Sequence, residues 1–130
     1  MLFHAHSGLR YLVLLLGVVV IVQTALALAT RKPYGGLTRG LASAFAGTLH
    51  LQVLLGLALL FTGRFSPALT GHIIVMVLAA AVAQIPVSVN KRRVEAERTH
   101  LPHLIFAVVA LLLIWAGVTA IGRPLLGTGG

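Results

Sequence analysis

Four long apolar stretches, at residues 9–30, 41–62, 72–89 and 104–121, limit what this chain can fold into. Each is close to the ~20 residues that an α-helix needs to cross a hydrocarbon core of about 30 Å. The connections between them are short, so almost nothing remains for a soluble domain. The mean hydropathy of +1.02 lies well outside the range of ordinary soluble domains. The sequence therefore predicts an integral membrane protein.

We expect an all-α fold, a four-helix transmembrane bundle in which residues 1–130 form a single transmembrane domain. With their flanking turns, the expected spans are 6–30, 39–63, 67–90 and 101–122. Ser66-Pro67 is typical of a helix start, and Pro86 should kink the third span. The first stretch also has features of a cleaved signal peptide. We favour a span, because cleavage would discard the histidines at the front of the chain.

The basic residues indicate the orientation of the spans. Seven of the ten lie in the connections between spans one and two and between spans three and four: Arg31, Lys32, Arg39, Lys91, Arg92, Arg93 and Arg98. By the positive-inside rule these connections are cytoplasmic and both termini are non-cytoplasmic. The net charge of +8 is then a topology signal that anionic membrane lipids satisfy. No nucleic-acid binding is expected, since these short clusters have no interleaved aromatic residues.

Small or polar residues recur at helical spacing in every span and mark the faces that we expect inside the bundle. In the first span they are His6, Arg10, Val13, Gly17, Val20 and Thr24. In the second span they are Arg39, Ser43, Ala46, His50 and Val53. In the third span they are His72, Met76, Ala79, Ala83, Pro86 and Asn90. In the fourth span they are His103, Ala107, Ala110, Ile114 and Gly117.

The side-chain chemistry favours a bound cofactor over hydrolysis. The chain has six histidines but only two carboxylates, Glu95 and Glu97, so it has little with which to run acid/base hydrolysis. Neutral imidazole, by contrast, is a ready ligand for haem iron or a transition metal. The absence of cysteine excludes thiolate sites and c-type haem attachment. Phosphate-binding and nucleophile motifs are also absent, which argues against a hydrolase or transferase.

Three histidines are candidate ligands. His50 lies near the middle of the second span, where an imidazole indicates a ligand, a proton or quinone contact, or a hydrogen bond to Gln23 or Thr24. His72 begins the third span, with Met76 one turn later on the same face. The third candidate is His6, at the start of the first span.

His6 lies one turn before Arg10, at the same non-cytoplasmic level as His72. Arg10 is a candidate partner for a haem propionate, or it extends to the headgroups. At a rise of ~1.5 Å per residue, His72 lies about 8 Å into its helix and His50 about 20 Å from the end of its own. His6 and His72 are therefore the easier axial pair, which leaves His50 to a deeper layer or to Met76.

The other histidines are weaker candidates. His4 lies on a different helical face from His6 and is expected to face solvent. His100 and His103 adjoin a basic connection, where interfacial histidines need no cofactor. Gln52 and Gln84 are candidates for hydrogen bonds around a cofactor, or for bridges between helices.

Three motifs give the chain its resemblance to a group of small bacterial inner-membrane proteins labelled cytochrome b-like. They are 4–11 (HAHSGLRY), 50–56 (HLQVLLG), and His72 with Met76. The resemblance covers nearly the whole length and implies haem binding in a multi-pass protein of the bacterial inner membrane. Members often carry an acidic residue before the third-span histidine, whereas this chain has Gly71, so a proton relay there is not expected.

We expect a protein that binds haem b through His6, His50 or His72, with Arg10 and Met76 nearby, and transfers electrons, with quinone as the natural partner. We expect it to act with quinone or as a small subunit of a respiratory or photosynthetic complex, and to form a homo-oligomer or part of a larger membrane complex. One alternative is copper or zinc held by His4, His6 and His72, or by His50. Another is a structural subunit without a cofactor.

Overall fold

The computed structural model describes residues 2–64, 66–119, 121 and 122, and in these residues it is helical without strands. The long helices are α1 (Leu2–Ala29), α2 (Gly36–Leu59), α3 (Thr70–Arg92) and α4 (Leu101–Thr119). A π-helix, η1 (Leu60–Arg64), and a 3-10 helix, η2 (Pro67–Leu69), connect α2 to α3. A second 3-10 helix, η3 (Glu95–Glu97), precedes α4. The predicted bundle of four apolar helices, each long enough to cross a membrane, is confirmed.

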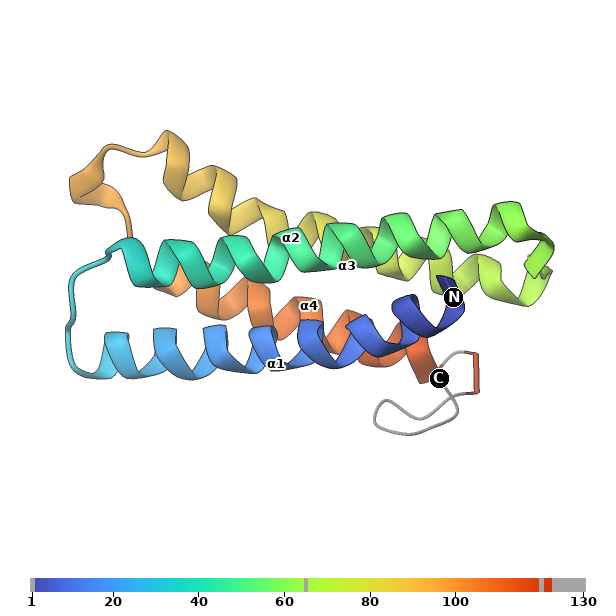
Figure 1. Ribbon diagram of the computed structural model, residues 1–130. Helices are drawn as coiled ribbons and strands as arrows, with labels where there is room; N and C mark the ends of the chain where they lie inside the picture. The colour runs from blue at the N-terminus through green and yellow to red at the C-terminus, as the bar shows by residue number, and fades with distance from the viewer. Residues whose placement is uncertain (1, 65, 120, 123–130) are drawn as a thin grey trace.

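The helices run up and down the bundle, and each packs against the next, while α4 also packs against α1 (Figure 1). The start of α1, the end of α4 and the α2 to α3 connection lie together at what we call the terminal end. The connections 30–35 and 93–100 lie together at the opposite end, which we call the loop end. Polar and basic residues of two distant connections are therefore neighbours.

Local signals fix where the helices begin and end. Lys32 N–H donates to the Ala27 carbonyl at 2.8 Å, and Arg31 reverses the chain with a φ of 56°. Ser66 caps η2 by accepting from Ala68 N–H at 3.4 Å, as the Ser66-Pro67 pair predicts. α3 continues through Pro86 as one helix, although proline cannot donate the backbone hydrogen bond.

The buried faces of α1, α3 and α4 follow the predicted stripes. Val20 of α1, Ala79 of α3 and Ala110 of α4 are each at most 1% exposed. Small side chains let neighbouring helices approach closely, which is the main source of helix association where lipid surrounds the bundle. The small stripes thus form one shared interior, as their spacing predicts.

The predicted face of α2 is only partly correct. Ala46 is buried as predicted, and His50 and Val53 are half-buried, but Arg39 and Ser43 are exposed. The other buried residues are Thr38, Ala42, Phe45 and Leu49. Large apolar side chains fill the interior here, with Phe45 2% exposed and Leu49 1% exposed. A search for small or polar residues therefore misses the large residues of this face.

Large apolar side chains cover the outside of the bundle. They include Leu15, Leu26, Leu54, Leu112 and Trp115, each more than half exposed. In water, a surface with so many exposed apolar side chains would cause aggregation. In a membrane, the hydrocarbon of the lipids surrounds it. This surface and the four candidate spans fit a multi-pass membrane protein.

Gly17 is the glycine at the tightest helix contact, so adding a methyl group there should destabilise the bundle. A Cβ at Gly17 would lie 2.7 Å from Leu111 Cδ2 and 3.0 Å from Phe45 Cε1. We expect Gly17→Ala to cost about 1–3 kcal/mol of stability, measured as a lower melting temperature in detergent. Gly47→Ala is the matched control, because a Cβ there has nothing within 4 Å. Equal melting temperatures for the two variants would contradict this packing.

Candidate functional site

A cavity of about 410 Å³ lies at the terminal end, and all four long helices line it. This volume is within the range of ordinary ligand and cofactor sites. Most of the lining is apolar, with Ile114 and Val118 of α4 as examples. The polar and sulfur-containing side chains that line it are His6, Ser7, Arg10, Gln52, His72 and Met76.

His6 is held against α2 by two hydrogen bonds. Its Nδ1 lies 3.0 Å from the backbone oxygen of Gln52, and the Gln52 amide donates to the His6 carbonyl at 2.6 Å. Because a carbonyl only accepts, Nδ1 carries the proton, and the lone pair of the neutral ring is on Nε2. The His6 ring packs directly against Gly56, where a Cβ would lie 3.0 Å from His6 Cε1.

His72 of α3 is held in the same way against α4. Its Nδ1 donates to the backbone oxygen of Gly117 at 2.8 Å, so its ring lone pair is also on Nε2. A second ring nitrogen bonded to a backbone carbonyl is the usual arrangement for a histidine that ligates a metal. Met76 lies one turn further along α3, and its Cε would be 3.2 Å from a Cβ at Gly117.

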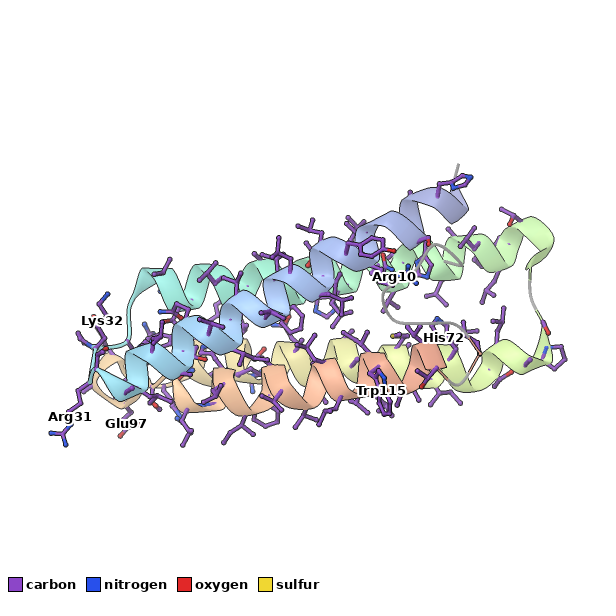
Figure 2. All side chains as sticks on the ribbon, turned by 90° about the horizontal axis from the view of Figure 1, so that it is seen from below. Arg10, Arg31, Lys32, His72, Glu97 and Trp115 are labelled. Atoms are coloured by element: carbon purple, nitrogen blue, oxygen red, sulfur yellow. The ribbon has the colours of Figure 1, made fainter. Side chains whose placement is uncertain are left out.

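Arg10 lines the same cavity and is only 8% exposed. Its Nη2 donates to the Tyr11 hydroxyl at 2.9 Å, and its guanidinium lies 4.8 Å from the centre of the Tyr11 ring. In Figure 2, Arg10 on α1 and His72 on α3 lie on opposite sides of the space between the helices. A permanent positive charge in a mainly apolar wall favours an anionic group on any ligand.

His50 does not line this cavity. Its Nε2 lies 2.9 Å from Gln84 Oε1, and the Gln84 amide donates to the Ser88 hydroxyl at 3.1 Å. The side chain thus links α2 to α3, and its partner is Gln84 rather than Gln23 or Thr24. Of the predicted ligands, the structure brings together His6, His72, Arg10 and Met76, and it places His50 elsewhere.

The residues proposed for copper or zinc do not form a ligand set. His4 is exposed, and within the described part of the chain no three histidine or carboxylate side chains are grouped as a metal site. His6 and His72 are the two imidazoles of the cavity. A haem, which supplies four equatorial ligands of its own, needs only two from the protein.

His100 is buried at the loop end, against the expectation of an interfacial side chain. It is 4% exposed, its Nε2 donates to the Lys32 carbonyl at 3.0 Å, and its Nδ1 lies 2.8 Å from the Thr38 hydroxyl. Thr38 also donates to Gln23 Oε1 at 3.0 Å. These bonds join α1, α2 and the start of α4.

His103 is 1% exposed and belongs to a second group of hydrogen bonds. Its Nε2 lies 3.0 Å from the Asn90 amide nitrogen and 2.9 Å from the Tyr34 hydroxyl, and the Tyr34 ring is stacked on it with centroids 5.5 Å apart. Asn90 is fixed in turn by the backbone of Thr99, at 3.1 and 3.3 Å. Burial raises the pKa of Tyr34, and the charges of Arg39 and Arg98 partly offset this rise. The sequence-based prediction missed these polar partners.

Comparisons with known proteins do not assign the chain to a family. No family model matches the chain, and neither the curated proteins nor the solved structures give a significant match.

The two carbonyl contacts predict the proton position on each ring. We expect Nδ1 of His6 and of His72 to carry a proton in the cofactor-free protein, because each Nδ1 faces a backbone oxygen, which can only accept. The ¹⁵N chemical shifts of the ring nitrogens in detergent distinguish the two tautomers, and His6→Ala and His72→Ala assign the signals. An unprotonated Nδ1 on either ring would contradict these carbonyl contacts.

Proposed function

We propose that this protein binds haem b at the terminal end, with His6 and His72 as axial ligands, and that it transfers electrons within the membrane. One observation carries the proposal. Two histidines from α1 and α3 line the same cavity, and each donates its Nδ1 proton to a backbone carbonyl of a neighbouring helix. That arrangement leaves the Nε2 lone pair of each neutral ring as the ligating atom.

The residues around the cavity are suited to hold a haem. Gln52 and the Gly117 carbonyl hold the two imidazoles in orientation, which raises their strength as ligands. Arg10 would pair with a propionate, a charge-assisted contact that is strong in an apolar wall. Gly56 leaves space for the His6 ring. When bound, haem b supplies one-electron oxidation and reduction, and the apolar lining sets its potential by limiting solvent access.

The proposed setting is the bacterial inner membrane, with the loop end cytoplasmic and both termini on the other side. Support comes from the concentration of basic residues in connections 30–35 and 93–100 and their flanking turns, which meet at one end. Membrane quinone is the proposed electron partner, since it reaches the bundle laterally through lipid. Association with a second copy or with a larger redox complex would place another cofactor within electron-transfer range.

Removal of either axial histidine should abolish the cytochrome spectrum. We expect wild-type protein, purified from cells supplied with haem, to give b-type bands in a reduced-minus-oxidised spectrum and in the pyridine haemochrome assay. His6→Ala and His72→Ala should lose the bands. His50→Ala is the matched control and should keep them, because His50 contacts Gln84 outside the cavity. A colourless wild type would contradict the proposal, and metal analysis of that sample would then test for copper or zinc.

A methyl group at Gly56 should weaken haem binding without removing a ligand. A Cβ there would lie 3.0 Å from the His6 ring, and disturbing the contacts that orient a ligating histidine typically costs about 10–100-fold in affinity. We expect Gly56→Ala to retain much less haem than Gly47→Ala, which alters the same helix where nothing lies within 4 Å. Haem content per protein, measured by haemochrome assay, makes the comparison. Equal retention would show that the His6 ring is not positioned as described.

A further inference from the structure

The cavity at the terminal end is closed on one side and open on another. Arg10 and Val13 of α1 and Ile114 of α4 line it and are 8%, 2% and 3% exposed, so the wall between these two helices is closed. Val77 of α3 lines the same cavity but is 46% exposed. A side chain that contacts both the cavity and the surroundings marks a place where the two are continuous. The cavity therefore reaches the outer surface of the bundle beside α3.

The hydrogen bond between α2 and α3 shows which residue lies opposite Val77. The two helices are antiparallel neighbours (Figure 1), and His50 Nε2 of α2 lies 2.9 Å from Gln84 Oε1 of α3. About two helical turns from this pair toward the terminal end, the chain has Leu57 on α2 and Val77 on α3. Leu57 also lines the cavity. The cavity thus opens between α2 and α3, and we call this place, with Leu57 and Val77 at its edges, the lateral opening.

The lateral opening faces the hydrocarbon of the membrane. At ~1.5 Å per residue, Val77 lies about 15 Å from Pro67, where the third candidate span begins. A hydrocarbon core is about 30 Å thick, so this depth is well inside it. Ile74 and Leu78, which are neighbours of Val77 on α3, are 55% and 50% exposed, as expected of side chains that contact lipid. A molecule that enters here from outside must therefore be soluble in the membrane.

The edges of the lateral opening suit an uncharged ring. Leu57, Ile73 and Val77 are apolar residues of the cavity lining, so they offer no partner to a charged headgroup. Within lipid the gain on docking comes from close packing, and a rigid ring loses less conformational freedom there than a flexible acyl chain does. Ile73 directly follows His72, the proposed axial ligand on α3. A ring held between these side chains therefore lies beside the proposed haem.

We propose that the ring of a membrane quinone docks in the lateral opening, between Leu57 of α2 and Val77 of α3. The proposal rests on the proposed function, in which quinone is the electron partner, and it adds the place where that partner binds. The position inside the hydrocarbon excludes a water-soluble electron carrier. The apolar edges beside the haem site favour a redox-active ring that arrives through lipid.

Photolabelling of the full-length protein in nanodiscs with an azidoquinone tests the proposal. We expect the label on the peptides that contain Leu57 and Val77, and an excess of unlabelled quinone should displace it. Val77→Trp and Leu57→Trp, which fill the lateral opening from its two edges, should each lose most of the label. Leu78→Trp is the matched control and should keep it, because Leu78 adjoins Val77 on α3, is 50% exposed and does not line the cavity.

Equal labelling of Val77→Trp and Leu78→Trp would overturn the proposal. A label that excess phospholipid displaces as well as quinone does would also overturn it, because acyl chains would then fill the lateral opening. The haem content of each sample, from the haemochrome assay, separates this test from that of the proposed function. A colourless wild type that still takes up displaceable label at Leu57 and Val77 would contradict the haem assignment but support the docking site. A wild type that holds haem but takes up no displaceable label would overturn the docking site alone.

Discussion

Polar side chains between the helices of this bundle need partners in the chain, because hydrocarbon offers none. Three imidazoles inside the spans satisfy this need by reaching a neighbouring helix. His6 bonds to the Gln52 carbonyl, His72 to the Gly117 carbonyl and His50 to the Gln84 side chain. These contacts join α1 to α2, α3 to α4 and α2 to α3, so the polar residues also define how the helices pair.

The two ends of the bundle meet this requirement differently. At the loop end, His100 uses both ring nitrogens on the Lys32 carbonyl and the Thr38 hydroxyl, so it has no lone pair to offer a metal. At the terminal end, His6 and His72 each use Nδ1 on a carbonyl, beside a cavity of about 410 Å³. We therefore place the proposed cofactor at the terminal end.

The spans could be predicted from sequence because length and hydropathy alone decide membrane crossing. The buried faces of α1, α3 and α4 followed from their small residues. For α2 the small residues predicted only Ala46 of the buried face, because large apolar residues such as Phe45 and Leu49 make up much of it. The rise per residue of an α-helix predicted that His6 and His72 lie at the same level. It could not predict the contact between His72 and Gly117, which depends on how α4 is rotated about its axis. The stripe of the fourth span predicted that His103 is buried, but it could not predict the contact with Tyr34, which lies far away in sequence.

The central claim is that His6 and His72 hold one haem between them, and the ferric spin state tests it most directly. Haemin added to the cofactor-free protein in nanodiscs should bind at one equivalent and give a low-spin electron paramagnetic resonance spectrum typical of two imidazole ligands. The His50→Ala variant should give the same spectrum. A high-spin spectrum, or haemin uptake without saturation at one equivalent, would contradict the account.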